Sequence, residues 1–347
     1  MKTSQRAVGF DQHLPLSDQA SFQDLKVNLP TIKSHDLLVK VEGVSVNSVD
    51  TFVRRGGNRN RLKHPKIIGW DAVGTVAAVG SQTSLFETGD RVWYAGEFTR
   101  SGSNVEYQRV DERIVGHAPV NLNTTQAAGI PLVGLTAYES LFEQLPLQLA
   151  QHASQQKETI LIINGGGGVG SMAIQLAKLA GLTVIATASR PQSINWVTQL
   201  GADYVVNHHH DLVQQIQDLG FNTVDFVMNL NNLDGHWNEI ANIIKPAGHV
   251  VATTENKRGI DLQKLTKKRV TFAWEWMYSK AYYQTADMIS QHHILDHLAQ
   301  LYDKGQLKPI VTKSYHPINA ANMRSAHRDV ESGHMIGKVT LTGWQAD

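Results

Sequence analysis

The chain contains no cysteine. This absence excludes disulfide bonds, thiolate nucleophiles, iron–sulfur clusters and every zinc site that needs a sulfur ligand. An excess of one charge is also lacking, because 32 Lys and Arg stand against 31 Asp and Glu, for a formal net charge of +1. This balance provides no basic surface for a nucleic acid or an anionic membrane, so we expect neither as a partner.

Long apolar runs are lacking as well. No stretch reaches the roughly 18 uninterrupted apolar residues that a membrane-spanning helix needs. Residues 1–16 mix polar and charged residues with apolar ones, unlike the continuous apolar core of a secretory signal. We therefore expect a cytoplasmic protein. Its 347 residues favour two globular domains at about 150 residues per domain.

The first third of the sequence predicts a mostly β, barrel-like domain. Its short, valine-rich runs are separated by glycine-containing turns, which is typical of short strands. These runs are 37–44, 73–79, 90–94 and 106–110. We expect no helix of ordinary length before Thr124.

From Thr124 onward, strand-like and helix-like segments alternate, which predicts an α/β fold with a doubly wound parallel sheet. The expected strands are 159–164, 183–189, 204–206, 224–230, 249–254 and an aromatic one over 269–278; the expected helices are 125–141, 169–180, 191–200 and 233–244. The tail then predicts a helix over 286–302, a strand over 310–316, a helix over 320–330 and a strand over 338–342. We expect residues 1–126 and 283–347 to form one β-rich domain and 127–282 to be an inserted one.

A glycine-rich loop lies between the predicted strand 159–164 and the predicted helix that follows it. Its sequence, GGGGVG, satisfies the G-x-G-x-x-G pattern of dinucleotide-binding folds. Gly165 allows the tight turn, Gly167 lets the backbone approach a pyrophosphate, and Gly170 lets the helix pack closely on the strand. A purely structural glycine turn is the alternative. The predicted cofactor-binding positions here are Gly165, Gly167, Gly168, Val169 and Gly170.

No Asp or Glu occurs between Gly170 and Asp203. A cofactor without a 2′-phosphate is normally bound by an acid about 20 residues after the glycine loop. The second predicted strand ends instead in Ser189 and Arg190, which offer a hydroxyl and a guanidinium to a 2′-phosphate. We therefore predict NADPH rather than NADH as the cofactor. A solvated Arg190 at the start of a helix is the alternative.

Five segments together resemble the medium-chain dehydrogenase/reductase superfamily, and within it the quinone oxidoreductase (ζ-crystallin-like) branch and bacterial proteins called zinc-type alcohol dehydrogenase-like. The segments are 46–51 (VNSVDT), 65–74 (PKIIGWDAVG), 89–92 (GDRV), 134–137 (GLTA) and 167–170 (GGVG). The resemblance implies a Rossmann domain that binds NADP(H), inserted between two parts of a GroES-like substrate domain. It also implies pairing into dimers or tetramers, with 270–278 as a candidate edge strand, and we predict a homodimer.

The same segments depart from the zinc alcohol dehydrogenases. Those enzymes carry a cysteine where this chain has Asn47, and a Gly-His-Glu motif where it has Gly69-Trp70-Asp71. Because a catalytic zinc needs about three protein ligands, we predict no metal here. The dense histidine groups, 208–210 and the pair His293 and His297, are interpreted as solvated faces.

The resemblance also implies candidate catalytic residues. Asn47 would lie near the nicotinamide and donate to a carbonyl oxygen, and Thr136 would contact the nicotinamide end. Lys338 resembles a family position near the cofactor. The alternatives are a turn-capping asparagine for Asn47 and a buried helix hydroxyl for Thr136. Tyr94 could line the substrate cleft or donate a proton, or be an ordinary aromatic on a strand face.

Three further side chains near these motifs have expected roles. We expect Asp50 to brace Arg54 or Arg55 rather than to perform acid–base chemistry. We expect Trp276 and Tyr278 either to shape the substrate cleft or to pack in the core.

Without a metal or a cysteine, the sequence predicts a reaction that the cofactor performs largely alone. Hydride transfer to a quinone or to the β-carbon of an α,β-unsaturated carbonyl fits this condition. Alcohol oxidation would need a base, and these motifs contain no obvious one. The alternatives are a reductase of 2-alkenals or enoyl thioesters, and a non-catalytic cofactor-binding protein like the ζ-crystallins.

Overall fold

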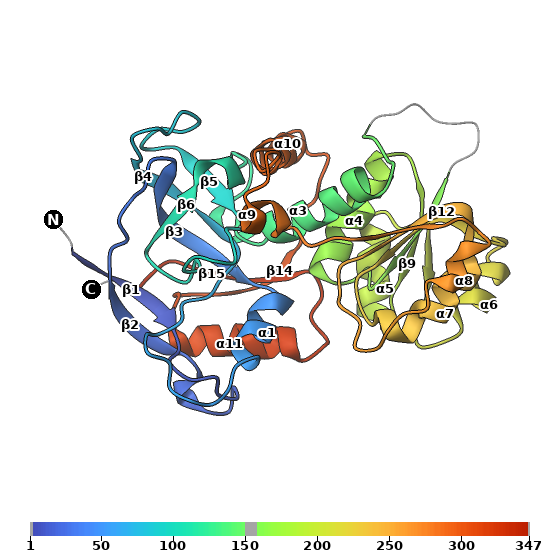
Figure 1. The fold of residues 1–347 in the computed structure, drawn as a ribbon, viewed down its shortest axis with the longest axis horizontal. Coiled ribbons are helices and arrows are strands. Elements are labelled where there is room, and N and C mark those ends of the chain that lie inside the picture. The colour runs from blue at the N-terminus through green and yellow to red at the C-terminus, as the bar shows by residue number, and fades with distance from the viewer. Residues whose placement is uncertain (1–2, 150–157, 346–347) are drawn as a thin grey trace. The chain divides into compact units, whose positions relative to one another are not determined.

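A computed structural model of the chain describes residues 3–149 and 158–345. They form two compact units (Figure 1). The first, called here the mixed-sheet unit, comprises Met1–Leu135 and Tyr278–Asp347; the second, the parallel-sheet unit, comprises Thr136–Met277. The parallel-sheet unit is thus inserted in the chain between two parts of a β-rich unit, which confirms the predicted fold class.

The mixed-sheet unit contains one large sheet and one two-stranded sheet. In the large sheet the order is β14, β15, β3, β4, β5, β7, with β6 also pairing with β3. The strands are β3 (Asp36–Val46), β4 (Ala72–Val79), β5 (Arg91–Tyr94), β6 (Tyr107–Asp111), β7 (Val115–His117), β14 (Val311–Tyr315) and β15 (Lys338–Thr342); β1 (Ser4–Gly9) pairs with β2 (Gln23–Asn28). The four valine-rich runs of the sequence all form strands here.

The helices of this unit include one that the sequence did not predict. Helix α1 (Ser48–Arg55) precedes Thr124, and the Asp50 carboxylate accepts a hydrogen bond from the Asn47 backbone N–H at its start, at 2.8 Å. Its β-branched residues, such as Val49 and Thr51, obscure the helical pattern. The other helices are α2 (Thr124–Ala127), α9 (Ser279–Tyr283), α10 (Ser290–Asp303) and α11 (Ala320–Glu331).

The helix expected over 125–141 is interrupted. Helix α2 ends at Ala127 and α3 (Pro131–Glu139) begins at Pro131. Proline lacks the N–H that a continuous helix would require there, so it starts a new helix instead. A π-helical turn, Ser140–Gln144, then follows α3.

The parallel-sheet unit is a six-stranded parallel sheet in the order β10, β9, β8, β11, β12, β13. Its strands are β8 (Thr159–Ile163), β9 (Thr183–Thr187), β10 (Tyr204–Val206), β11 (Val224–Asn229), β12 (Ile244–Ala252) and β13 (Thr271–Trp274). Its helices are α4 (Gly168–Leu179), α5 (Pro191–Gln199), α6 (Leu212–Asp218), α7 (Leu233–Ile243) and α8 (Gln263–Thr266). Helix α4 contacts β8 and β9, and α7 contacts β11 and β12 (Figure 1). The aromatic strand expected over 269–278 is shorter than expected and lies at the sheet's edge.

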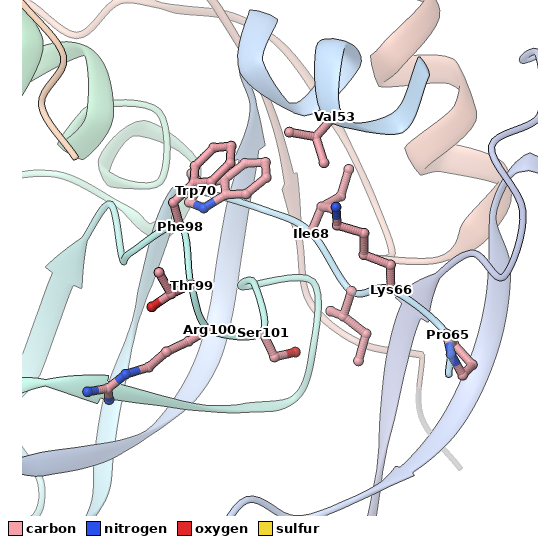
Figure 2. A pocket seen from close by; sticks show the side chains of 10 residues that line it. Val53, Pro65, Lys66, Ile68, Trp70, Phe98, Thr99, Arg100 and Ser101 are labelled. Atoms are coloured by element: carbon pink, nitrogen blue, oxygen red, sulfur yellow. The ribbon is translucent and has the colours of Figure 1, made fainter. Parts of the chain in front are cut away.

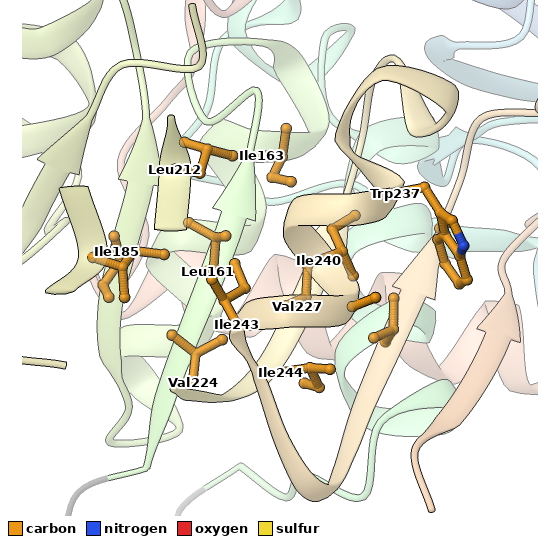
Figure 3. Close-up of a cluster of buried hydrophobic side chains, with 14 of the residues drawn as sticks. Leu161, Ile163, Ile185, Leu212, Val224, Val227, Trp237, Ile240, Ile243 and Ile244 are labelled. Atoms are coloured by element: carbon orange, nitrogen blue, oxygen red, sulfur yellow. The ribbon is translucent and has the colours of Figure 1, made fainter. Parts of the chain in front are cut away.

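An aliphatic core joins the sheet to helices α6 and α7. Leu161 and Val227 from neighbouring strands are fully buried and meet Leu212 and Ile240 from these helices, with Trp237 at one side (Figure 3). Side chains of this kind each contribute about 1.5–3 kcal/mol when fully buried. This core holds the strand ends in place without any disulfide. Among the described helices, none is long and apolar enough to cross a membrane.

The glycine loop turns tightly between β8 and α4. The Gly165 N–H donates to the Thr187 carbonyl at 3.1 Å, and the Asn164 N–H donates to the Thr187 hydroxyl at 2.8 Å. Helix α4 comes so close that a Cβ on Gly170 would lie 2.5 Å from the Asn164 carbonyl oxygen. Only glycine fits at this position.

Gly170→Ala therefore forces the backbone of the loop apart. We expect a loss of about 1–3 kcal/mol, seen as a fall of several degrees in the thermal unfolding temperature measured by circular dichroism. The matched control is Gly166→Ala, where the added Cβ would lie 3.4 Å from the Cβ of Ser193, an ordinary contact. Equal stability of the two variants would contradict the close packing.

Candidate functional site

The carboxyl edge of the parallel sheet carries an anion-binding arrangement of backbone groups. Helix α4 begins at Gly168, and its N-cap is Gly167, which has no side chain to accept the first N–H groups of the helix. The N–H groups of Val169 and Gly170 belong to this first turn and have no intrahelical acceptor. Together with the positive end of the helix dipole, they suit a phosphate group.

Ser189 and Arg190 follow β9 at the same edge of the sheet, and both are half-buried. Asp203 is the first acid after the glycine loop, and its carboxylate is already engaged. It accepts hydrogen bonds from Lys178 Nζ at 2.7 Å and from the Val184 N–H at 2.8 Å. This edge therefore presents a hydroxyl and a guanidinium where an acid would bind the ribose of NADH.

Two residues with buried polar atoms at this edge were missed by the sequence analysis. Asn229 ends β11 and is fully buried, yet neither polar atom of its side chain has a hydrogen-bond partner among the described residues. The Thr254 hydroxyl, just beyond β12, is also buried without a hydrogen-bond partner among the described residues. Buried polar atoms are nearly always paired, so these atoms fit a bound dinucleotide at the edge. Their only signal in the sequence is that each lies at or just after the end of a strand.

A cluster of buried polar side chains surrounds Asp71 in the mixed-sheet unit. The Asp71 Oδ2 atom accepts hydrogen bonds from Ser45 Oγ at 2.5 Å, Asn47 Nδ2 at 2.7 Å and Lys338 Nζ at 3.2 Å. Its Oδ1 atom accepts from the Leu132 N–H at 2.7 Å. Ser45, Asn47, Asp71 and Lys338 are called the Asp71 cluster below.

The register of the large sheet brings these distant residues together. Strand β15 pairs with β3 so that Val339 lies opposite Val46. Lys338 at the start of β15 is therefore close to Asn47, the residue just after β3, although the two lie 291 positions apart. The ammonium group donates to the Asn47 Oδ1 atom and, at 3.3 Å, to the Val46 carbonyl.

Lys338 supplies the positive charge of the cluster. It is 3% exposed, and Asp71 is fully buried. Burial lowers the pKa of Lys338, while the neighbouring Asp71 and Asp50 carboxylates raise it. Buried charges are tolerated only when paired and hydrogen-bonded, and this pair meets both conditions.

The cluster fixes the orientation of the Asn47 amide. Lys338 can only donate, so it sets the position of the amide oxygen, and Asp71 accepts one N–H of the amide nitrogen. The amide nitrogen carries a second N–H, and no hydrogen bond within the described residues uses it. Asn47 also occupies the N-cap position of α1, where its backbone carbonyl accepts a hydrogen bond from the Asp50 N–H at 3.1 Å.

Asp50 does not brace an arginine, so that expectation is wrong. Its carboxylate caps the start of α1, while Arg54 turns to the Leu14 carbonyl and Glu331. Burial raises the pKa of Asp50 to about 7, and Lys338 opposes this rise. Asp50 therefore keeps a proton to higher pH than an ordinary aspartate.

The remaining candidates lie in different surroundings. Thr136 is on α3 in the parallel-sheet unit, with 7% exposure. Tyr94 is on β5, fully buried, and its hydroxyl has no partner among the described residues. Burial raises the pKa of Tyr94 well above its ordinary value. Of the predicted residues, Asn47 and Lys338 are in direct contact, whereas Thr136, Ser189, Arg190 and the glycine loop belong to the other unit.

A pocket of about 300 Å³ lies in the mixed-sheet unit, beside the segment that leads into Asp71. Trp70 and Phe98 stack on each other with ring centroids 4.9 Å apart, and Ile68, Lys66 and Val53 also line the space (Figure 2). The aromatic pair is backed by Tyr278, which packs edge-on against both rings and is 3% exposed. Trp276, by contrast, is 41% exposed.

The residues at the positions of the zinc ligands do not fit a zinc ion. The Asn47 amide is held by Lys338 and Asp71, and the Trp70 indole N–H donates to the Glu97 carbonyl at 3.3 Å. The ammonium of Lys338 adds a positive charge that repels a second cation. Elsewhere within residues 3–149 and 158–345, no group of three or more His, Asp or Glu side chains could hold a metal, and this includes the histidine groups noted above. His208 and His297 are half-buried rather than solvated, whereas His293 is exposed.

Lys338→Met removes the cation that is bonded to Asp71. We expect the free energy of unfolding to fall by about 3–5 kcal/mol, because an unpaired carboxylate stays buried. The double variant Asp71→Asn/Lys338→Met removes both charges and should recover much of this loss. Urea unfolding of both variants and of the wild-type chain measures the difference. A single variant as stable as the wild-type chain would contradict the ion pair.

Comparisons with known proteins agree with this arrangement of units. Residues 33–129 match the profile of the alcohol dehydrogenase GroES-like domain, and residues 168–291 match that of zinc-binding dehydrogenases. A zinc-type alcohol dehydrogenase-like protein of Staphylococcus epidermidis is 39% identical over 97% of this chain and 99% of its own length. A chloroplastic quinone-oxidoreductase homolog of spinach (Spinacia oleracea) is 28% identical over 92% of this chain and 94% of its own.

Solved structures extend the comparison to the whole fold. A crystal structure from Rhizobium etli CFN 42, provisionally described as a zinc-dependent alcohol dehydrogenase, is 39% identical, with a TM-score of 0.93 over 100% of both chains. Sequence identity and fold agree over the full length of the chain. The chain therefore belongs to the medium-chain dehydrogenase/reductase superfamily of oxidoreductases, among the zinc-type alcohol dehydrogenase-like proteins.

Proposed function

We propose that the chain is a zinc-independent reductase that uses NADPH to reduce a quinone or an α,β-unsaturated carbonyl. The observation that carries this proposal is the Asp71 cluster. There the Lys338 ammonium donates hydrogen bonds to Asn47 and Asp71, which stand where the zinc alcohol dehydrogenases have zinc-binding residues. The kinship with a quinone-oxidoreductase homolog supports the same acceptor class.

The choice of NADPH is supported by the carboxyl edge of the parallel sheet. The first turn of α4 offers N–H groups to the pyrophosphate. Ser189 and Arg190 offer a hydroxyl and a guanidinium to the 2′-phosphate, and the nearest following acid, Asp203, is held by Lys178. The side chain of Asn229, which has no partner among residues 3–149 and 158–345, offers further hydrogen bonds at this edge.

The proposed reaction requires the protein to orient the cofactor and the acceptor and to donate a hydrogen bond to the acceptor oxygen. When bound, NADPH supplies a hydride, and a conjugated acceptor is electrophilic enough to take it without a metal. The free N–H of Asn47 can donate to the acceptor oxygen as negative charge develops there. Lys338 strengthens this donor, because it binds the amide oxygen and polarises the amide. The Asp71 cluster thus provides an oriented donor in place of a Lewis acid.

The pocket beside Trp70 supports a compact, planar acceptor. Its volume of about 300 Å³ is at the lower end of the range for small-molecule sites. The aromatic faces of Trp70 and Phe98 and the side chain of Ile68 favour a flat, conjugated ring over a long acyl chain. This observation favours a quinone or a small enone over an enoyl thioester.

Asn47→Ala removes the proposed donor to the acceptor oxygen. We expect kcat with a quinone or enone to fall at least about 100-fold, the usual cost of losing one such donor, while the Kd for NADPH changes less than about threefold. NADPH oxidation and NADPH binding measure the two quantities. The control is Asn123→Ala, because Asn123 caps α2 outside the cluster. Unchanged turnover in Asn47→Ala would remove Asn47 from the mechanism.

Arg190→Ala tests the choice of cofactor. Loss of a guanidinium partner of the 2′-phosphate should weaken NADPH binding by about tenfold or more and leave NADH binding unchanged. Binding titrations with both cofactors give the ratio. Lys267→Ala, an exposed cation before β13, serves as the control. A ratio of NADPH to NADH affinity equal to that of the wild-type chain would show that Arg190 does not select the cofactor.

A second copy of the chain is the proposed protein partner. Strand β13 lies at one edge of the parallel sheet, and Trp274 at its end is 46% exposed. An open edge with an exposed aromatic residue suits pairing with the same edge of a second copy. We expect a dimer mass by light scattering at micromolar concentration, and a shift toward the monomer in Trp274→Lys. A wild-type monomer under these conditions would contradict the dimer.

A further inference from the structure

Two buried glutamates in the parallel-sheet unit have no role in the reaction described above. Glu139 is the last residue of α3 and is 2% exposed. Glu275 directly follows β13 and is 5% exposed. Glutamates are almost never buried to this degree unless they are paired. Their pairing is therefore informative about what the two side chains do.

The two carboxyl groups are hydrogen-bonded to each other. Ionised carboxylates only accept hydrogen bonds, so this contact requires one proton between them. Glu275 also accepts a hydrogen bond from Gln144 Nε2 at 3.2 Å, and its backbone N–H donates to the Ala252 carbonyl at 2.9 Å. The pair thus joins the end of α3 and the turn after it to the ends of two neighbouring strands.

The charges around the pair favour retention of this proton. Burial, the charge of Glu139, its hydrogen bond and the charge of Glu143 together raise the pKa of Glu275 to about 9, against the hydrogen bond from Gln144, which lowers it. Among the described residues, the groups with the largest effect on the pKa of Glu275 include no cation. Tyr138 on α3 faces Glu143, and burial and that charge raise its pKa. The pair therefore holds a single proton at neutral pH and loses it only in alkaline solution.

The position of the pair connects it to the proposed cofactor site. Thr136 lies three residues before Glu139 on α3, so the two side chains share a face of the helix, one turn apart. Helix α3 passes into the π-helical turn Ser140–Gln144 immediately after Glu139. Such turns are locally weak and often occur at functional sites. A contact at Glu139 therefore sets where the last turn of α3, with Thr136, lies against the sheet.

We propose that Glu139 and Glu275 are positioning residues, which share one proton and fasten the last turn of α3 to the carboxyl edge of the parallel sheet. They act through Thr136, whose hydroxyl contacts the nicotinamide end of the cofactor. This inference rests on the proposed function, because it requires NADPH to bind at that edge. Loss of the shared proton places two negative charges in contact and moves the helix turn away from the edge.

The test is the pH dependence of NADPH binding, measured by fluorescence titration without any acceptor. The wild-type chain should bind NADPH about fivefold or more weakly at pH 10 than at pH 7, a coupling of ordinary size. Glu275→Gln should bind equally at both values, because its amide N–H donates to Glu139 without a titrating proton. Glu158→Gln is the control, since Glu158 is exposed, directly precedes β8 and is not among the groups that shift the pKa of Glu275, and it should behave like the wild-type chain.

A second variant tests the route through Thr136. In Thr136→Val, the contact with the cofactor is already absent, so the loss of affinity at pH 10 should largely disappear. The positioning role is overturned if Glu275→Gln or Thr136→Val binds NADPH as much more weakly at pH 10 than at pH 7 as the wild-type chain is expected to. It is also overturned if the wild-type chain binds NADPH equally at both pH values. If Glu275→Gln changes only the unfolding temperature and not the pH profile, the pair is merely structural, which also overturns it.

The two levels of the proposal fail differently. Absence of NADPH binding at pH 7 in the wild-type chain overturns the proposed cofactor and the positioning role with it. Normal binding at pH 7 with the same pH profile in the wild-type chain and Glu275→Gln overturns the positioning role alone.

Discussion

The charge of Lys338 is the constraint on which the Asp71 cluster depends. Its ammonium group binds Asp71 and the Asn47 amide oxygen within the protein interior. Asp71 in turn holds the end of β3 through Ser45 and the start of α3 through the Leu132 N–H. A zinc ion at this place would bind a substrate oxygen directly. The Lys338 ammonium already donates its three hydrogen bonds within the protein, so it can only orient and polarise the neighbouring Asn47 amide. The proposed reaction therefore depends on an electrophilic acceptor and on the hydride of the cofactor rather than on a Lewis acid.

The parallel-sheet unit depends on a different constraint, the close approach of α4 to β8 at Gly170. This packing exposes the first N–H groups of the helix at the carboxyl edge of the sheet. The same edge carries polar atoms of Asn229 and Thr254 that have no hydrogen-bond partner within the described part of the chain, and the half-buried Arg190. Each of these groups lies at or just beyond the end of a strand, so the aliphatic core around Leu161 and Val227 determines their spacing. In this unit, packing sets the geometry of the binding groups, whereas in the Asp71 cluster an ion pair does.

Local patterns in the sequence were sufficient to predict the fold and the part of the candidate site that lies in the parallel-sheet unit. The spacing of apolar residues, together with the glycine loop, predicted the inserted parallel sheet and the order of its strands and helices along the chain. It also predicted the strand that leads to Ser189 and Arg190. Contacts between distant residues could not be read in this way. Arg54 and Asp50 have a favourable helical spacing, yet Arg54 pairs with Glu331, 277 positions away. The contact of Lys338 with Asn47 depends on the pairing of β15 with β3. The family resemblance pointed to both residues but not to their contact with each other.

The most direct test of this account is NADPH oxidation by the purified wild-type chain with a panel of quinones, enones and simple aldehydes, with and without prior dialysis against a chelator. The account predicts turnover of a quinone or an enone that is unchanged by the chelator and much weaker with NADH. Aldehyde reduction that is lost after chelation would contradict it, because a metal ion would then have to bind in place of the hydrogen bonds of the Asp71 cluster.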